Sequence, residues 1–322
     1  MQRNRRRTFV NSSAPEVELK SDDFADNLSD FIAHLKYLDR SDYTIEYYRR
    51  ELRKFMHTLE DMRFKTDLRA ITGDLIESEY IRYMSDEVGV KHATIAATLR
   101  ALRAFFNWAA NKGVIESSPM AQITIGVPKA PTIETFSRDQ LRELFSQPDP
   151  KLFVGLRDLT IMTLMVETGV RVRELCDIRL DDIRSEDNQI LIAGKNGEDR
   201  LVPIQTQTKR LLKRYLQARG ESPVEWLFIS HDDEQMNRDS VRRRIAKYGR
   251  MAGIDNVRCS PHTFRHTFAK MSVQNGADIF SLQRILGHKS MDMVRRYVNM
   301  YGDDVKQAHE RFSPVENLRL RF

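Results

Sequence analysis

Cations beside expected helix ends are the residues of this chain whose types and spacing could do chemistry. Arg171 follows a turn at Gly169 and stands at the start of a helix, where the helix dipole disfavours a positive charge. His262 and Arg265 lie three residues apart in the first turn of a helix that begins at Ser260-Pro261, so the two side chains share a face. Backbone N–H groups at such a helix start also bind anions. These positions together indicate the binding of an anion.

Three further residues could take part in such chemistry. Lys195 lies in the turn of an expected hairpin, His288 follows the glycine that ends a helix, and Tyr297 comes nine residues after His288. Taken singly, each of them is better explained by structure than by catalysis, since a lysine in a turn, for example, is usually only solvated. Their significance depends on their combination with the three residues above.

Several enzyme classes are excluded because their motifs are missing. The sequence has no Walker A loop, no glycine-rich dinucleotide fingerprint, no HExxH zinc motif and no nucleophile elbow. His262 and His266 have the i, i+4 spacing of a metal chelate, but no third ligand is clustered near them in the sequence, so we predict no metal site. Cys176 and Cys259 form no CxxC motif and fit a reducing cytoplasm rather than a disulfide scaffold.

Length and composition favour a cytoplasmic protein of two domains. The chain has 322 residues, of which 41% are hydrophobic and 30% are charged, as in globular proteins. Its 52 Lys and Arg against 46 Asp and Glu give a net charge of +6, which permits a polyanionic partner without demonstrating one. No stretch approaches the roughly 18 apolar residues of a membrane span. The arginine-rich start lacks the apolar segment of a secretory signal.

Helical periodicity organises the first third of the chain. Apolar residues recur at three- and four-residue steps, as on the buried face of an amphipathic helix. These patterns cover residues 24–38, 43–60, 73–87 and 94–110. We therefore predict an all-α domain over residues 23–113, preceded by a basic, disordered tail over residues 1–22. The outer faces of its two longer helices carry a first group of cations, Arg49, Arg50, Arg53, Lys54, Arg100 and Arg103.

A linker and a second domain follow. Periodicity is lost over residues 114–136, where three prolines interrupt the chain. Structure resumes at Ser137-Arg138-Asp139-Gln140, a capping-box pattern that begins a domain extending to residue 312. This domain is mostly helical, but two β-favouring runs, 189–193 and 201–204, indicate a hairpin.

A basic helix is expected within the second domain, over residues 239–251. Its apolar residues recur at helical spacing, and its polar side carries a second group of cations. That group consists of Arg242, Arg243, Arg244 and Lys247. Two basic faces, one in each domain, could contact a polyanion through its phosphates, whereas for any single one of these cations a solvated face is an equally good explanation.

In chain order, the six candidate residues form the pattern Arg…Lys…His-x-x-Arg…His…Tyr. They occur in the segments TGVRVREL, IAGKNGEDRLVPI, PHTFRHTFA, LQRILGHKS and RRYVNM. In this pattern the chain resembles the tyrosine recombinase (phage integrase) family, in particular the Xer recombinases and the integrases of mobile elements. The resemblance covers the whole chain. Glu174, three residues after Arg171, also matches an acidic position of the family.

The resemblance implies a reaction in which a tyrosine attacks a DNA phosphodiester, forms a 3′-phosphotyrosine and releases a 5′-hydroxyl. The residue types suit it, because guanidinium groups stay charged and bind phosphate oxygens, while a phenol needs help to lose its proton. The resemblance implies that Tyr297, rather than Tyr301, is the nucleophile and that Arg171 and Arg265 bind the phosphate. It implies that His262 accepts a proton or positions the nucleophile, and that His288 donates a hydrogen bond to the phosphate. Lys195 would donate a proton to the leaving oxygen, and Glu174 would orient the catalytic groups. No metal and no other cofactor is implied.

The resemblance also implies the fold and the assembly. The expected fold is mainly α, with an N-terminal SAM-like four-helix core-binding domain and a mostly helical, mixed α+β catalytic domain that carries a small β-hairpin. The two domains would clamp double-stranded DNA. Four protomers would join two recombination sites through a Holliday junction, with accessory DNA-bending or directionality factors as further partners. The tail over residues 313–322 would pack on a neighbouring protomer.

Alternatives stay open at this stage. The ending RRYVNM…HERFSPVENL favours integration or excision of a mobile element, in a bacterium or a phage, over resolution of chromosome or plasmid dimers. A type IB topoisomerase shares the chemistry but relaxes DNA as a monomer, and the hydrophobic C-terminal tail argues against it. A DNA-binding protein that never cuts is disfavoured by the complete catalytic set.

Overall fold

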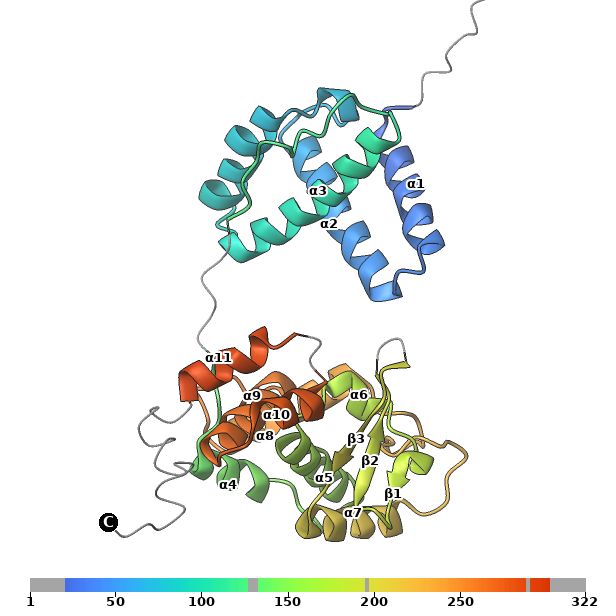
Figure 1. The fold of residues 1–322 in the computed structure, drawn as a ribbon, viewed down its shortest axis with the longest axis vertical. Coiled ribbons are helices and arrows are strands. Elements are labelled where there is room, and N and C mark those ends of the chain that lie inside the picture. The colour runs from blue at the N-terminus through green and yellow to red at the C-terminus, as the bar shows by residue number, and fades with distance from the viewer. Residues whose placement is uncertain (1–20, 127–132, 195–196, 288–289, 302–322) are drawn as a thin grey trace, which may run out of the picture. The chain divides into compact units, whose positions relative to one another are not determined.

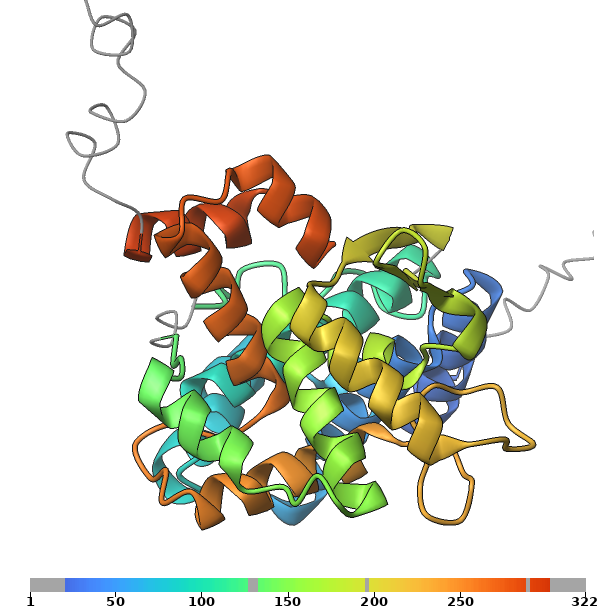
Figure 2. The same cartoon turned by 90° about the horizontal axis from the view of Figure 1, so that it is seen from below.

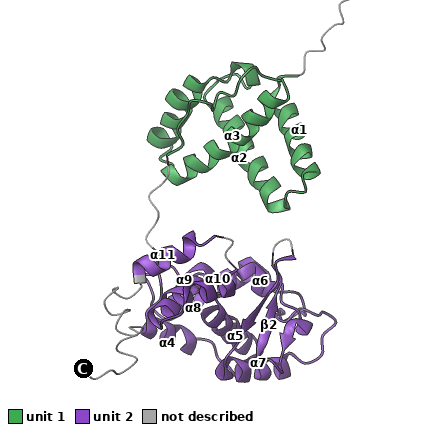
Figure 3. Ribbon diagram, viewed as in Figure 1, with its two compact units in different colours: residues 1–131 green, residues 132–322 purple. Residues whose placement is uncertain are grey.

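The computed structural model describes residues 21–126, 133–194, 197–287 and 290–301. The chain divides into two compact units, residues 1–131 and 132–322 (Figure 3). Within the described ranges, no helix combines the length and the apolar character that crossing a membrane requires. The molecule is mainly helical, as the sequence predicts.

The first unit is all helical (Figure 1). Its elements are α1 (Phe24–Tyr37), α2 (Asp42–Asp61), η1 (Leu68–Ala70), η2 (Leu75–Tyr80), η3 (Tyr83–Glu87) and α3 (His92–Asn111). The predicted helices 24–38, 43–60 and 94–110 are confirmed as α1, α2 and α3. The predicted helix over 73–87 is also present, but its two main segments, η2 and η3, are π-helical.

Aromatic side chains fill the core of the first unit. Phe24 and Phe105 are fully buried and lie 5.0 Å apart between ring centroids, and Trp108 stacks beside Phe105. The aromatic residues of these helices therefore form a core. Residues Val114, Ile115, Met120 and Ile123 are buried in the same core. The predicted linker over residues 114–136 therefore begins too early, because its first ten residues pack within the first unit.

The second unit contains helices and one small sheet. Its elements are α4 (Arg138–Ser146), α5 (Phe153–Thr168), α6 (Val172–Cys176), η4 (Leu180–Asp182), β1 (Ile183–Arg184), β2 (Gln189–Ile192), β3 (Arg200–Pro203), α7 (Thr206–Arg219), α8 (Arg238–Met251), α9 (Pro261–Gln274), α10 (Ile279–Leu286) and α11 (Asp292–Tyr301). The strands pair antiparallel in the order β1-β2-β3, with Ile190 opposite Val202. The sheet lies at one edge of the unit, and helices form the rest of it (Figure 1 and Figure 2).

The local signals in the sequence explain where the helices of this unit begin and end. Ser137 caps α4 and exchanges hydrogen bonds with Gln140, the predicted capping box. Ser260 caps α9, and Pro261 occupies its first position. Gly169 ends α5 and Gly287 ends α10, each in the left-handed conformation that glycine adopts without strain. These ends matter because the candidate residues stand beside them.

The helix α5 lies at the centre of the second unit and packs against α7 and α9. A smaller apolar cluster joins α9, α10 and α11. It includes Leu282, Leu286, Val294 and Tyr297, all of which are almost completely buried. This cluster fixes α11, the helix that carries the candidate nucleophile, against α9, the helix that carries His262 and Arg265.

Candidate active site

Four of the six candidate residues lie within the described residues. Arg171 is the residue before α6, His262 and Arg265 stand in the first two turns of α9, and Tyr297 lies in α11. Lys195 and His288 fall outside the described residues. His288 directly follows Gly287, the glycine that ends α10, and Lys195 directly follows Gly194 in the connection between β2 and β3.

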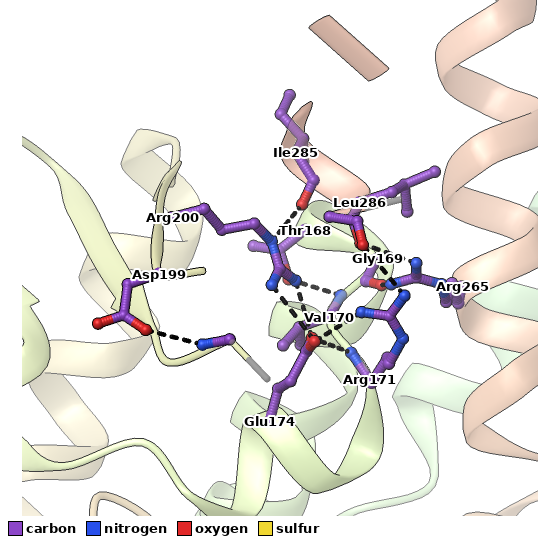
Figure 4. A network of polar contacts seen from close by, with 12 residues as sticks. Thr168, Gly169, Val170, Arg171, Glu174, Asp199, Arg200, Arg265, Ile285 and Leu286 are labelled. Carbon is purple, nitrogen blue, oxygen red and sulfur yellow. Dashed lines mark hydrogen bonds and ion pairs between the residues drawn. The ribbon is translucent and has the colours of Figure 1, made fainter. Parts of the chain in front are cut away.

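The C-terminal end of α10 is the meeting point of three arginines (Figure 4). Its three successive carbonyls, those of Ile285, Leu286 and Gly287, accept hydrogen bonds from Arg200 at 2.8 Å, Arg265 at 2.8 Å and Arg171 at 3.2 Å respectively. The last carbonyls of a helix have no partner within the helix, and they form the negative end of its dipole. The guanidinium groups therefore satisfy these carbonyls, and the helix end fixes the position of three positive charges.

Arg265 is the buried member of the group. Only 6% of it is exposed, and it also donates to the carbonyl of Gly169, at 2.6 Å, where α5 ends. Burial, together with the positive charge of Arg171, lowers the pKa of Arg265 to about 10. The guanidinium group is still protonated at neutral pH, so it supplies a permanent positive charge. Its two hydrogen bonds to backbone carbonyls fix the orientation of its plane.

Arg171 is the exposed member, with 44% of its side chain accessible. Its backbone N–H and its Nη1 donate to the two carboxylate oxygens of Glu174, at 2.9 and 2.7 Å. Burial raises the pKa of Glu174, but hydrogen bonds from Arg200 and Arg171 outweigh burial and hold that pKa below its usual range. The carboxylate of Glu174 thus binds both the backbone and the side chain of Arg171.

His262 is exposed on the same helix as Arg265. Burial of part of its ring, together with the positive charges of Arg242 and Arg265, lowers its pKa below the ordinary value. The imidazole is therefore neutral at neutral pH and is able to accept a proton.

Tyr297 is 1% exposed, and its hydroxyl lies 2.5 Å from Nδ1 of His266. Burial, together with neighbouring His262 and Arg265, lowers the pKa of His266, so this ring is also neutral. From its spacing in the sequence, His266 is a candidate for metal binding only. Among the described residues no group of three His, Cys, Asp or Glu side chains could hold a metal.

Arg200 is a second site residue that the sequence motifs do not identify. It is the first residue of β3, and the burial of this strand alternates so that Arg200 shares a face with the buried Val202. An arginine at an inward position of a strand is the signal that could have found it.

The predicted DNA-contacting cations have different surroundings. Arg53, Arg100 and Lys247 are exposed, whereas Lys54 is half-buried. The other predicted cations donate hydrogen bonds within the protein: Arg49 to Glu46, Arg50 to Glu51, Arg103 to the carbonyl of Ile123, Arg242 to Asp239, Arg243 to Ser240, and Arg244 to Asp158. Asp158 is buried and also binds Arg157, so Arg244 belongs to an internal network of charged side chains.

The described part of the site can bind an anion and act on it. It combines a fixed buried cation, a more exposed cation oriented by a carboxylate, a neutral imidazole at the start of α9 and a buried phenol. A guanidinium pair binds non-bridging phosphate oxygens through planar forks. The phenol and the imidazole are groups able to act as nucleophile and proton acceptor.

Comparison with known proteins shows which family the chain resembles. Residues 134–302 match the phage integrase family, and residues 28–113 match the N-terminal SAM-like domain of phage integrases. The chain is 30% identical to the tyrosine recombinase XerD of Vibrio cholerae over 84% of this chain and 90% of that protein. It is 27% identical to the tyrosine recombinase XerC of Thermodesulfovibrio yellowstonii over 89% and 96% of the two chains.

Solved structures share the fold. The XerH site-specific recombinase bound to a palindromic difH substrate matches with a TM-score of 0.69 and 23% identity, over 85% of this chain and 80% of that chain. The Tn1549 transposon integrase in complex with a circular intermediate DNA matches with a TM-score of 0.72 and 17% identity, over 93% and 100%.

Proposed function

The chain belongs to the phage integrase family and is a site-specific tyrosine recombinase, and from that premise we propose that it integrates or excises a mobile element through a 3′-phosphotyrosyl intermediate. The single observation that carries the proposed chemistry is the end of α10, where backbone carbonyls hold Arg171 and Arg265 beside the helix that bears Tyr297. Cations fixed in this way stabilise charge that develops on a phosphate without having to reorganise.

The proposed reaction assigns one step to each group. Arg171 and Arg265 bind the non-bridging oxygens of the scissile phosphate, and His288 donates a further hydrogen bond to it. Tyr297 Oη attacks the phosphorus as its proton passes to His262, and the bond from phosphorus to the 5′-oxygen breaks. Lys195 gives a proton to that oxygen, which is otherwise a poor leaving group. The second half of the reaction reverses these steps with a 5′-hydroxyl of another strand.

The bond energy is conserved in the phosphotyrosyl ester, so the proposed reaction needs no nucleotide cofactor. The positive charges of arginine and lysine act where metal ions act in other phosphoryl-transfer enzymes, and we propose no metal. We propose double-stranded DNA recombination sites as substrates, with Arg53, Arg100 and Lys247 among the phosphate contacts because their side chains are exposed.

The assembly is proposed from the relatives. The XerH and lambda integrase structures that match this chain contain DNA sites, and lambda integrase is present as a dimer. We propose four protomers on two sites, exchanging strands through a Holliday junction, inside the cytoplasm of a bacterium. Resolution of chromosome or plasmid dimers by the same chemistry is the alternative, and the sequence of the target site separates the two.

A covalent trapping experiment tests the proposed function. The target is first selected as the DNA that the purified protein retains from a pool of random duplexes and from genomic fragments. A nicked duplex of the selected sequence then traps the cleaved state, because the short fragment carrying the 5′-hydroxyl diffuses away. We expect a protein–DNA adduct with the natural protein, none with Tyr297→Phe, and an undiminished yield with Tyr301→Phe.

The variant Tyr297→Phe should bind the same DNA with unchanged affinity, because it loses only a hydroxyl. An adduct of full yield in Tyr297→Phe would assign the nucleophile to another tyrosine. Bound DNA without any adduct from the natural protein would instead support a DNA-binding protein that does not cut.

A further inference from the structure

Arg200 joins three parts of the second unit. It begins β3, its Nε donates to the carbonyl of Ile285 at 2.8 Å, and its Nη2 and Nη1 donate to the two carboxylate oxygens of Glu174 at 2.7 and 3.3 Å. All three nitrogens of the guanidinium group therefore have acceptors. A strand of the sheet, the start of α6 and the end of α10 are linked by one side chain (Figure 4).

The surroundings of Arg200 are closed. Only 9% of its side chain and 12% of that of Glu174 are exposed. A Cβ atom on Gly287 would lie 3.0 to 3.2 Å from Nη1, Cζ and Nε of Arg200, so the guanidinium group fills the space that a side chain at Gly287 would need. Arg200 is therefore placed to hold other groups of the site rather than to meet a phosphate itself.

These contacts form a closed ring with Arg171. Arg200 binds Glu174, Glu174 binds the backbone and the side chain of Arg171, and Arg171 binds the carbonyl of Gly287, which lies against Arg200. A carboxylate that is bound by two guanidinium groups is fixed on both sides. If Arg200 were absent, Glu174 would keep its bonds to Arg171 but would be free to swing toward the space that Arg200 occupied.

We propose that Arg200 is a positioning residue for the recombination reaction, acting through Glu174 to keep the guanidinium group of Arg171 in its phosphate-binding orientation. The inference rests on the proposed function. It follows that lysine should not replace Arg200, because one planar group must serve a carbonyl and both oxygens of a carboxylate at once, and an ammonium group cannot reproduce that fork.

The test compares three variants on two substrates. Arg200→Met keeps the length of the side chain and removes its donors, whereas Arg200→Lys keeps the charge. Arg219→Met is the matched control, because Arg219 is a buried arginine of the same unit that donates to the carbonyls of Gly220, Val224 and Trp226, none of which belongs to the site. The substrates are the nicked duplex with a normal scissile phosphate and the same duplex with a methylphosphonate, in which a methyl group replaces one charged oxygen.

Single-turnover cleavage is measured below the melting temperature of every variant, together with DNA affinity. We expect cleavage of the normal phosphate to fall about 10²-fold in Arg200→Met, the size of effect that a small misplacement of a catalytic group produces. Affinity should change little. On the methylphosphonate the deficit relative to the natural protein should be about tenfold smaller, because less charge has to be stabilised. Arg200→Lys should resemble Arg200→Met, and Arg219→Met should cleave like the natural protein.

Three results would overturn the inference. These are an equal deficit of Arg200→Met on both substrates, a wild-type rate in Arg200→Lys, and an equal loss in Arg219→Met. If Arg200→Met does not fold, Arg200→Lys carries the same comparison between substrates. Failure of the proposed function has a different signature, since the natural protein itself would then form no adduct on the normal phosphate.

Discussion

Arg171 and Arg265, the two proposed phosphate-binding arginines, share a chemical group but are held by different partners. Arg265 donates to two backbone carbonyls and is buried, whereas Arg171 donates to a carboxylate and one carbonyl and is much more exposed. Burial lowers the pKa of Arg265 to about 10. A lysine has a lower starting pKa, so the same shift would bring it close to losing its charge at neutral pH. A permanent cation at a buried position therefore requires a guanidinium group.

If His262 accepts the proton of the nucleophile, the reaction should depend on pH in a predictable direction. Burial, with the positive charges of Arg242 and Arg265, lowers its pKa, so its neutral form persists at pH values below 6.5. If neutral His262 accepts the proton of the nucleophile, cleavage should stay constant from pH 8 through pH 6.5 and decline only at lower pH. The measurement is the single-turnover rate of adduct formation across this range on the nicked duplex.

A variant of His262 tests whether this residue causes the decline of cleavage at low pH. His262→Gln keeps a hydrogen-bonding side chain that does not titrate, so its slower cleavage should lose the decline at low pH. A midpoint at or above 6.5 in the natural protein, or the same decline in His262→Gln, would show that another group controls proton acceptance.

The contact between His266 and Tyr297 shows what residue-level sequence reasoning lacks. The two residues are 31 positions apart, on α9 and α11, and their 2.5 Å contact follows from the packing of these helices around Leu286 and Val294. The order of motifs identified Arg171, His262, Arg265 and Tyr297 as one set, since a resemblance preserves order. It contained no distances, so the partner of the phenol could not be predicted.

At the scale of elements, the end of α10 organises the site more than any strand or loop. The N–H of Gly287 donates to the carbonyls of Arg284 and Gln283, while the next three carbonyls bind arginines. The left-handed conformation of Gly287, with φ of 63°, turns the chain directly before His288. One helix terminus therefore sets the position of the arginines and of the residue that precedes His288.

Gly287→Ala should damage the site beyond its effect on stability. A left-handed alanine costs about 1–2 kcal/mol of folding free energy, and the new Cβ would also press on the guanidinium group of Arg200. Gly253→Ala is the matched control, because Gly253 has nearly the same φ, 64°, with nothing within 4 Å of its Cβ position. Chemical denaturation should show similar losses of stability, whereas only Gly287→Ala should slow cleavage, by about tenfold or more. Equal cleavage by the two variants would contradict this reading of the helix end.

Element boundaries were predicted from the sequence where capping residues and periodicity agree. Helices begin at Ser137 and Ser260 and end at Gly287 as expected, because each of these residues acts through local backbone geometry. The strand β1 was missed, since two residues, Ile183–Arg184, are too few to show alternation. The predicted start of the linker was wrong for a different reason. Burial of Val114 and Ile115 depends on tertiary contacts with helices that lie far earlier in the chain.

At the scale of the whole molecule, net charge alone says little about DNA contacts. Arg50, Arg103 and Arg244 bind Glu51, the carbonyl of Ile123 and Asp158, so part of the positive charge serves the internal structure. A solvated lysine or arginine such as Lys247 or Arg53 releases counterions when it meets a phosphate. The DNA-binding surface must therefore be argued from exposed residues of both units and not from the total of +6.

The assembly should depend on the tail over residues 313–322, which lies outside the described residues. In sequence, Val315, Leu318, Leu320 and Phe322 give this tail apolar side chains that alternate with polar ones toward its end. A segment of this kind gains by packing on a neighbouring surface, at about 1.5–3 kcal/mol for each large apolar side chain that becomes fully buried. Donated head to tail around a ring of protomers, it would link four copies in a closed assembly.

Deletion of residues 313–322 should therefore leave a folded monomer that binds a single site but assembles poorly. We expect an unchanged cooperative thermal melt, an unchanged gel shift on one site, and a lower yield of the complex that holds two sites together. Cleavage should also lose its pairing between protomers, because the tail would couple neighbouring active sites. Loss of the cooperative melt would show that the tail packs within its own catalytic unit, since a segment donated to a neighbour contributes nothing to the stability of an isolated monomer.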